Sequence, residues 1–222
     1  MKKDDFNNWV FDLDNTLYSA ETGIFQQVDK LMGEFISKHL KLEIAEAKII
    51  QKKFFKEFGT TLRGLMNEYN VEPEFFLEEV HKLDYSIIKP NPLLADVLNK
   101  IHGKKILFTN ANRSHANEIM KRLKIENLFD NIFDIANANY IPKPDIKSYY
   151  KLIKNFDIDA KKTIMFDDIA RNLVPASKLG FTTVWIDVGK ENYSDDIANS
   201  KEYLDYETTN LPQWLNSFIN AL

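Results

Sequence analysis

"WVFDLDNTLY" (residues 9–18) places two acidic side chains, Asp12 and Asp14, at the end of an apolar run, with Thr16 two positions further on. A short apolar run of this kind predicts a strand buried on both faces, as in a parallel sheet. Neighbouring carboxylates raise each other's pKa unless another group compensates their charge. The stretch therefore predicts the first strand of a parallel sheet and a charged site where that strand ends.

The chain continues this pattern with further apolar runs. The predicted strands span residues 105–110, 163–168, 182–188 and, more weakly, 132–137. Segments with helical periodicity lie between them, at residues 91–101, 114–123, 145–156 and 170–179. Strands that alternate with helices predict an α/β fold with a doubly wound, Rossmann-like parallel sheet. We expect a loop over the polar residues 189–210 and a terminal helix over residues 211–222, with Trp214 facing the core.

Residues 20–88 interrupt the alternation, because helical patterns follow one another there without a convincing strand. We therefore expect a small helical cap at residues 20–88, inserted after the first strand, and an α/β core formed by residues 1–19 and 89–222. Six apolar residues of the cap are spaced for a helical core of its own. They are Phe54, Phe55, Phe58, Leu62, Leu65 and Met66.

The composition limits the classes of function. The chain has 222 residues, 44% of them hydrophobic, which suffices for one core and a smaller lid. Its formal net charge of −4 and the lack of a basic stripe argue against binding a nucleic acid polymer. The absence of cysteine fits a reducing compartment. Neither a signal peptide nor a membrane span is evident, so we expect a soluble, cytoplasmic protein, either a monomer or a homodimer.

Polar side chains follow the predicted strands at the points where the strands end. They are Asp12 and Asp14, Thr109 and Asn110, and Asp167 and Asp168, while Lys143 lies in the stretch after the weaker strand. The carboxyl ends of parallel strands meet at one edge of the sheet, so we expect these side chains to converge. Gathered carboxylates need a cation, and Mg²⁺ suits them because it prefers oxygen ligands and keeps several waters.

The four histidines are scattered over helical stretches without ligand spacing, which argues against zinc and predicts ordinary packing or surface roles. They are His39, His81, His102 and His115.

These residue types suit the chemistry of a phosphate ester. The Thr109 hydroxyl, backbone N–H groups at a helix start and the Lys143 ammonium can bind and neutralise phosphate oxygens. One aspartate can attack phosphorus and become an aspartyl phosphate. A second aspartate, two residues later, can protonate the leaving alkoxide and then activate the water that hydrolyses the intermediate. We therefore expect a small phosphomonoester as the substrate.

The order of these motifs resembles that of the haloacid dehalogenase-like hydrolase superfamily: Asp-x-Asp-x-Thr at residues 12–16, then a Thr, a Lys and an acidic pair. The resemblance implies that Asp12 is the nucleophile and a Mg²⁺ ligand, and that Asp14 is the general acid/base, with its backbone carbonyl on the metal. It makes Asp168 the acidic metal ligand. We expect the Thr16 hydroxyl to fix the turn and orient Asp14.

The resemblance also implies that Thr109, backbone amides near Asn110 and Lys143 hold the phosphoryl group. The chain departs from the family at its acidic pair. Asp167 stands where many relatives have glycine, and Asn172 stands where a second aspartate is common. We expect Asp167 and Asn172 to contact the metal ligands and orient them.

Four strings resemble the pyrimidine 5'-nucleotidase branch of the superfamily: FDLDNTLY (11–18), FGTTLRGLMNEY (58–69), FLEEVHKLDY (76–85) and FTNANRSHANEIMKRL (108–123). This resemblance implies hydrolysis of UMP, CMP and related monophosphates. Arg63, at a break between two cap helices, is the candidate substrate contact from the cap. The alternative is a phosphatase for another small metabolite, such as phosphoglycolate, pyridoxal phosphate or a sugar phosphate. A dehalogenase and a catalytically silent binding protein are weaker alternatives.

Overall fold

A parallel sheet runs through the computed structural model, which describes residues 5–189 and 194–220. Within these residues the sheet has six strands in the order β3-β2-β1-β4-β5-β6. The strands are β1 (Asn8–Phe11), β2 (Lys104–Phe108), β3 (Asn131–Phe133), β4 (Thr163–Asp167), β5 (Thr182–Ile186) and β6 (Tyr206–Thr208). All neighbouring strands pair in parallel, and the chain winds outward from β1 on both sides. The predicted doubly wound α/β fold is confirmed.

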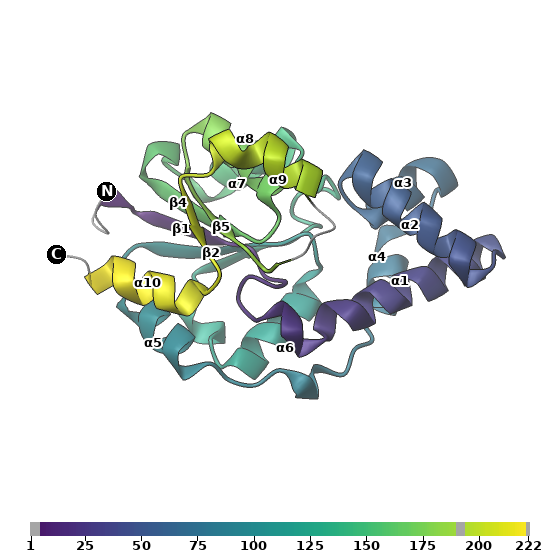
Figure 1. Cartoon of the computed structure of the whole chain (residues 1–222), viewed down its shortest axis with the longest axis horizontal. Coiled ribbons are helices and arrows are strands. Elements are labelled where there is room, and N and C mark those ends of the chain that lie inside the picture. The colour runs from purple at the N-terminus through teal and green to yellow at the C-terminus, as the bar shows by residue number, and fades with distance from the viewer. Residues whose placement is uncertain (1–4, 190–193, 221–222) are drawn as a thin grey trace.

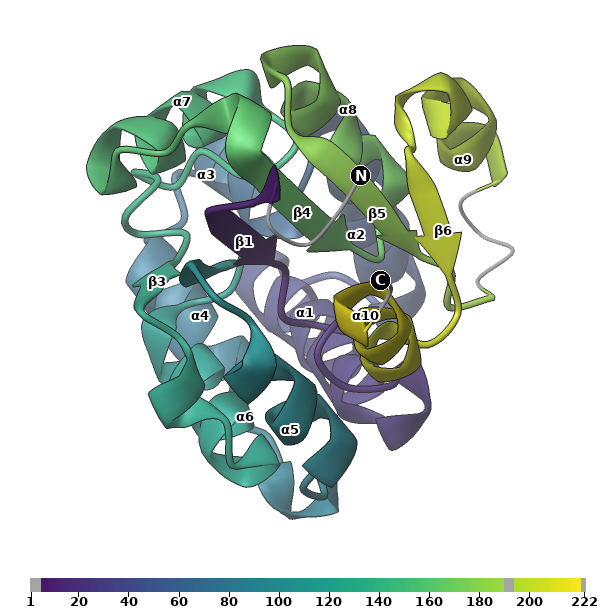
Figure 2. The ribbon, with the colours of Figure 1, turned by 90° about the vertical axis from the view of Figure 1, so that its left-hand side faces the viewer.

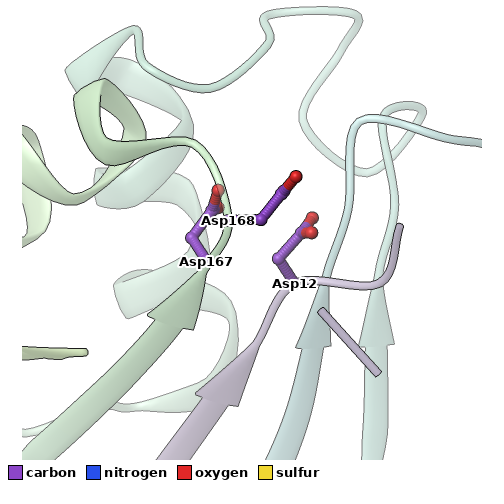
Figure 3. Close-up of side chains that lie close together, drawn as sticks. All are labelled: Asp12, Asp167 and Asp168. Carbon is purple, nitrogen blue, oxygen red and sulfur yellow. The ribbon is translucent and has the colours of Figure 1, made fainter. Parts of the chain in front are cut away.

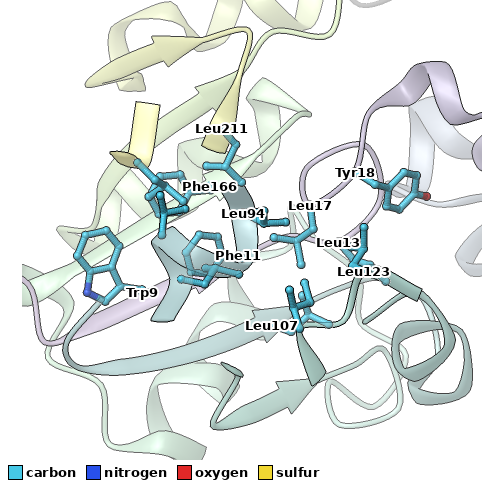
Figure 4. Close-up of a cluster of buried hydrophobic side chains, with 14 of the residues drawn as sticks. Trp9, Phe11, Leu13, Leu17, Tyr18, Leu94, Leu107, Leu123, Phe166 and Leu211 are labelled. Atoms are coloured by element: carbon cyan, nitrogen blue, oxygen red, sulfur yellow. The ribbon is translucent and has the colours of Figure 1, made fainter. Parts of the chain in front are cut away.

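Helices cover both faces of the sheet (Figure 1 and Figure 2). They are α5 (Pro92–Lys100), α6 (Arg113–Leu123) and α10 (Leu211–Asn220) on one face, and α7 (Ile146–Phe156) and α8 (Ala170–Leu179) on the other. Successive side chains of β1 alternate between these faces. Phe11 packs in the cluster with α5, α6 and α10 (Figure 4), whereas Val10 packs in the cluster with α7 and α8. Both faces of β1 are buried, as its apolar run predicts.

The packing of β1 against β4 fixes the position of the candidate site. Phe11 of β1 stacks on Phe166 of β4, with ring centroids 4.7 Å apart and planes 6° apart. The next backbone N–H, that of Asp12, donates to the carbonyl oxygen of Phe166 over 2.9 Å. Burying an aromatic side chain contributes about 1.5–3 kcal/mol. This packing therefore keeps Asp12 at the carboxyl edge of the sheet.

Four helices lie between β1 and α5 in the chain and form a unit beside the sheet domain (Figure 1). They are α1 (Ile24–Leu40), α2 (Ile44–Phe58), α3 (Thr61–Tyr69) and α4 (Pro73–Val80). All four fall within residues 20–88, a segment called the helical insert below. The insert has an apolar cluster of its own, which Ile135, from the loop after β3, also joins.

The helical insert uses most of the apolar residues predicted for its interior. Five of the six belong to its cluster or pack against it: Phe54, Phe58, Leu62, Leu65 and Met66. Phe55 is the exception, because its half-buried ring lies 4.2 Å from the Arg171 guanidinium carbon of α8. Adjacent helical residues point about 100° apart, so Phe55 faces the sheet domain while Phe54 faces the interior of the insert.

The prediction of a loop over residues 189–210 is wrong for most of the part that the structure describes. Helix α9 (Ser194–Ser200) and strand β6 lie there, while residues 190–193 fall outside the described residues. β6 is short, polar and at the sheet edge, so it lacks the apolar run that marks the inner strands. The predicted terminal helix is α10, and Trp214 packs against Phe166 at 5.7 Å, as expected. No helix among the described residues is long and apolar enough to cross a membrane.

Candidate active site

Three carboxylates converge where β1 and β4 end (Figure 3). Asp12 directly follows β1, Asp167 is the last residue of β4, and Asp168 follows it. One oxygen from each lies within 4.8 Å of the others. β1 and β4 are neighbours in the sheet. The strands β2 and β3 lie on one side of β1 and the later strands β4 to β6 lie on the other, so the strand order reverses between β1 and β4. In a doubly wound fold, ligands usually bind at the carboxyl edge beside such a reversal.

The buried ammonium of Lys143 compensates two of these charges. Its Nζ lies 2.7 Å from Asp12 Oδ1 and 2.7 Å from Asp167 Oδ2, and it donates to the carbonyl oxygen of Phe108 over 2.9 Å. Burial opposes the charged form of Lys143, but Asp12 and Asp167 outweigh it and raise the lysine pKa above its usual range. Lys143 is therefore a permanent cation inside the site.

Asp167, fully buried, has hydrogen bonds on both oxygens. Its Oδ1 accepts from the backbone N–H of Ile169 over 2.9 Å and from Asn172 Nδ2 over 3.0 Å, and its Oδ2 accepts from Lys143. Asn172 is itself buried. These contacts give the departure from the family pattern a physical reason. Where Asp167 replaces glycine, an amide donor at position 172 satisfies its carboxylate, whereas another aspartate would repel it.

The remaining charge in the cluster suits a divalent cation. Burial raises the pKa of Asp12 to about 7, as do the charges of Asp167 and Asp14, against the opposing effect of Lys143. A divalent ion beside Asp12 would favour its ionised form again. Asn15 Nδ2 donates to Asp168 Oδ2 over 3.3 Å, while the buried Oδ1 of Asn15 has no hydrogen-bond partner among the described residues. Carboxylates with an unpaired amide oxygen fit a hydrated, oxygen-preferring ion such as Mg²⁺.

The Asp14 side chain is absent from this three-carboxylate cluster. Its Oδ1 accepts from the Tyr18 hydroxyl over 2.5 Å and lies 2.8 Å from His115 Nε2. Burial would raise the pKa of Asp14, but the neighbouring His115 and the hydrogen bonds from His115 and Tyr18 lower it to about 2. The Thr16 hydroxyl, which the sequence suggested for this task, is buried without a partner among the described residues. Tyr18 and His115 therefore hold Asp14.

The sequence reasoning missed His115. Its ring is buried in the first turn of α6, whereas a packing or surface role was predicted. The signal available in the sequence was its position, one helical turn into the segment that follows Thr109 and Asn110. A helix that starts at the carboxyl edge of a parallel sheet directs its first turn toward the site.

Thr109 and Asn110 lie at the end of β2, next to β1. The Thr109 hydroxyl is buried and accepts from the backbone N–H of Ala111 over 3.0 Å, which leaves its proton available to a phosphate oxygen. The Asn110 side chain contacts the backbone of Lys143 twice: Oδ1 accepts from its N–H over 2.9 Å, and Nδ2 donates to its carbonyl oxygen over 3.2 Å. The Asn110 side chain therefore holds the lysine loop in place.

The helical insert meets the sheet domain beside Lys143. At Gly59, which ends α2 with a φ of 86°, a Cβ would lie 3.2 Å from the Lys143 carbonyl oxygen. The guanidinium of Arg171 donates to the carbonyl oxygens of Phe55, over 3.1 Å, and of Gly59, over 3.5 Å. Arg63 follows in the first turn of α3, half-buried. The break between α2 and α3 therefore lies against the lysine loop, with Arg63 close to it in the chain.

Several proteins resemble this chain in sequence. Phosphate metabolism protein 8 of Saccharomyces cerevisiae is 28% identical over 158 residues, which cover 64% of this chain and 49% of the yeast protein. The chain thus spans about half the length of that relative. Glyceraldehyde 3-phosphate phosphatase of Methanocaldococcus jannaschii is 24% identical over 219 residues, 92% of this chain and 93% of the archaeal protein. Sesquiterpene phosphatase astK of Aspergillus oryzae is 22% identical over 179 residues, 79% of this chain and 87% of the fungal protein.

Solved structures share the fold. L-2-haloacid dehalogenase from Xanthobacter autotrophicus superposes with a TM-score of 0.59 at 14% identity, covering 98% of this chain and 100% of that one. The HAD-hydrolase YfnB from Bacillus subtilis, solved bound to magnesium, superposes with a TM-score of 0.59 at 16% identity, covering 97% of this chain and 99% of that one.

The pyrimidine 5'-nucleotidase branch stays a prediction. A model of the haloacid dehalogenase-like hydrolases matches residues 9–180, most of the chain, and the chain belongs to this family.

Proposed function

We propose that this hydrolase is a Mg²⁺-dependent phosphomonoesterase that works through an aspartyl phosphate on Asp12. The observation that carries the proposal is the convergence of Asp12 with Lys143 and Asp168 at one edge of the sheet, with Asp14 two residues beyond Asp12. The names of two relatives, which include the word phosphatase, support the same reaction. Asp12, Asp168 and the backbone carbonyl of Asp14 would hold the metal, whose positive charge stabilises the phosphoryl oxygens.

The chemistry divides between the two aspartates. First, a carboxylate oxygen of Asp12 bonds to phosphorus as the bond from phosphorus to the ester oxygen breaks, and Asp14 protonates that departing oxygen. Asp14 is ionised in the free chain, and the negative phosphoryl group raises its pKa in the complex. Then the oxygen of a water bonds to phosphorus, its proton passes to Asp14, and the Asp12 carboxylate leaves. The Lys143 ammonium and the Thr109 hydroxyl orient the phosphoryl oxygens.

We further propose that residues 20–88 act as a cap and that the substrates are pyrimidine nucleoside 5'-monophosphates, UMP and CMP. The motif strings that resemble the pyrimidine 5'-nucleotidases support this preference. Gly59 packs on the Lys143 loop, so the start of α3 adjoins the proposed phosphoryl site. Arg63 in that first turn is the proposed contact with the leaving nucleoside. A cap that closes over the site would also exclude water other than the attacking one.

A panel assay tests the substrate. Phosphate release is measured with Mg²⁺ from UMP, CMP, dTMP, purine monophosphates, phosphoglycolate, pyridoxal phosphate and sugar phosphates. Highest kcat/KM on UMP or CMP is expected. Glyceraldehyde 3-phosphate joins the panel as a second candidate, because a relative named for that activity aligns over 92% of this chain. Preference for it, or for phosphoglycolate, would replace the nucleotide assignment and leave the phosphatase assignment standing.

The nucleophile is tested by Asp12→Asn. An amide cannot form the acyl phosphate, so we expect turnover on the preferred substrate to fall by at least about three orders of magnitude. The side chain keeps its shape, so far-UV circular dichroism and the melting temperature should report a folded protein. EDTA should silence the unmodified enzyme and excess Mg²⁺ should restore it. Full activity of Asp12→Asn would refute the mechanism.

A further inference from the structure

His115 joins the candidate acid/base to the helical insert. Its ring is buried in the sheet domain, and Nε2 lies 2.8 Å from Asp14 Oδ1. The same Oδ1 accepts from the Tyr18 hydroxyl. No hydrogen bond to the other oxygen, Oδ2, occurs among the described residues, which leaves Oδ2 for a proton transfer to the substrate in the proposed reaction. The two donors thus turn the carboxylate so that one oxygen is held and the other is available.

The opposite side of the same ring is held by the segment that returns from the insert to the sheet domain. His115 Nδ1 lies 2.9 Å from the hydroxyl of Tyr85, which also lies 3.2 Å from the carbonyl oxygen of His81. The ring of His81, at the end of α4, stacks on the ring of His115 with centroids 4.3 Å apart and planes 20° apart. Residues 81–85 therefore determine where the His115 ring sits.

Hydrogen-bond chemistry places a proton on Nε2 of His115. Asp14 Oδ1 already accepts from the Tyr18 hydroxyl, so in its contact with His115 the ring nitrogen Nε2 is the donor. The Tyr85 hydroxyl has one proton, which goes either to the carbonyl oxygen of His81 or to His115 Nδ1, and in the first case its oxygen can accept from Nδ1. In both arrangements Tyr85 holds the Nδ1 side of the ring while Nε2 donates to Asp14.

We propose that His115 is a positioning residue for Asp14, and that it transmits the placement of residues 81–85 of the helical insert to the acid/base carboxylate. The inference rests on the proposed function, because it assigns Asp14 the proton transfers. A general acid must lie within hydrogen-bond reach of the departing oxygen, and small misplacement lowers turnover steeply. With His115 in place, the orientation of Asp14 depends on the packing of the insert against α6.

Two substitutions separate the two contacts of the ring. In His115→Gln the side-chain nitrogen can reach the position of Nε2 and still donate to Asp14, whereas in His115→Asn it lies near the position of Nδ1 and can meet only Tyr85. We expect His115→Asn to lower kcat for phosphate release about 10–100-fold with KM changed less than about threefold, as for other residues that orient a reacting group. We expect His115→Gln to stay within about fivefold of the unmodified enzyme.

Melting temperatures separate positioning from packing. Both substitutions remove an aromatic ring from the stack with His81, so both should lower the melting temperature by similar amounts. Equal losses of kcat in the two variants, or full kcat in His115→Asn, would overturn the proposal. In an Asp14→Asn background, replacing His115 with Asn should cost no further activity, since the group it positions is gone. Independent, additive losses would also overturn it.

A readout that needs no activity keeps this inference distinct from the proposed function. Nitrogen chemical shifts of ¹⁵N-labelled histidine show which ring nitrogen is protonated. We expect the His115 signals of the unmodified protein to report a proton on Nε2, and Asp14→Asn to shift them. A proton on Nδ1 with Nε2 bare would contradict the inference even in an active phosphatase. Failure of every phosphomonoester in the panel, with the Nε2 proton observed, would remove the proposed function and leave the contact standing.

Discussion

Lys143 shows how one buried cation can hold a site together. Its ammonium contacts Asp12 and Asp167 at 2.7 Å each, and its side chain is 1% exposed. Taking such charges out of water is expensive, and mutual attraction repays the cost only if each charge keeps its partner. We therefore expect the loss of one charged partner to lower the free energy of unfolding much more than the loss of a positive and a negative partner together.

Lys143→Met should lower the free energy of unfolding by about 3–5 kcal/mol, because it leaves two carboxylates buried without their cation. Urea unfolding followed by circular dichroism measures the loss. Adding Asp167→Asn should recover at least about 1 kcal/mol of it. The amide oxygen at position 167 can still accept from Ile169 and Asn172, while one buried negative charge disappears. If the double variant is less stable than Lys143→Met alone, the pairing does not control stability.

At the scale of elements, two glycines inside the helices of the insert offer a matched comparison. Gly64 lies in α3 against α2, where an added Cβ would fall 2.2 Å from Cγ and 2.4 Å from Cβ of Phe54. Gly33 lies in α1, where an added Cβ would fall 3.4 Å from Gln51 Oε1 and 3.6 Å from Lys48 Cγ. The first position lets two helices approach closely, and the second has room for a methyl group.

Gly64→Ala should therefore destabilise the protein by about 1–3 kcal/mol or more, since α2 and α3 must move apart. Gly33→Ala should be neutral or stabilise by up to about 1 kcal/mol, because glycine in a helix interior costs that much relative to alanine. Thermal unfolding of both variants checks the pair. Similar shifts in the two melting temperatures would contradict the packing of α2 on α3.

Arg171 links α8 to the end of α2 through two carbonyl oxygens and the ring of Phe55. Arg171→Leu should speed amide hydrogen exchange in residues 55–63 and leave the amides of β1 and β4 unchanged, because it removes contacts between insert and sheet domain. Lys178→Leu is the control on the same helix, since that ammonium lies 5.0 Å over the ring of Tyr203, away from the insert. Exchange that is equally fast in both variants would assign Arg171 a role in α8 alone.

Considered as a whole molecule, the fold follows from local patterns wherever the elements are buried. The inner strands carry continuous apolar runs and alternate with helices, so their positions in the chain and their parallel pairing can be predicted before any contact is known. Strand β6 was not predicted, because an edge strand such as Tyr206–Thr208 does not need a continuous apolar run. The site residues at strand ends were predictable for the same reason, since parallel strands bring Asp12, Thr109 and Asp168 to one edge. Lys143 lies in the loop after β3, and the Asn110 side chain holds its backbone there.

Contacts between distant side chains could not be read from the sequence. His115 and Asp14 are 101 positions apart, and their meeting depends on how α6 packs beside the turn after β1. Even the contact between Asp167 and Asn172, which are five positions apart, depends on the turn between β4 and α8. Sequence spacing predicts which groups reach an edge of the sheet, and the packing of helices decides which of them touch.

The proposed Mg²⁺ site at the acidic edge would couple the stability of the folded chain to the concentration of Mg²⁺. A ligand that binds the folded state alone stabilises it by RT ln(1 + [L]/Kd), about 2.7 kcal/mol at one hundred times Kd. Mg²⁺ should therefore raise the melting temperature in proportion to the logarithm of its concentration. Asp168→Asn should remove most of this rise, since it takes one oxygen ligand from the cluster. Asp159→Asn is the control, because Asp159 is exposed and lies before β4 at the opposite edge of the sheet. This variant should keep the rise in melting temperature with Mg²⁺. A rise that persists in Asp168→Asn would place the cation elsewhere, and a rise lost equally in both variants would point to diffuse screening by the net charge of the chain.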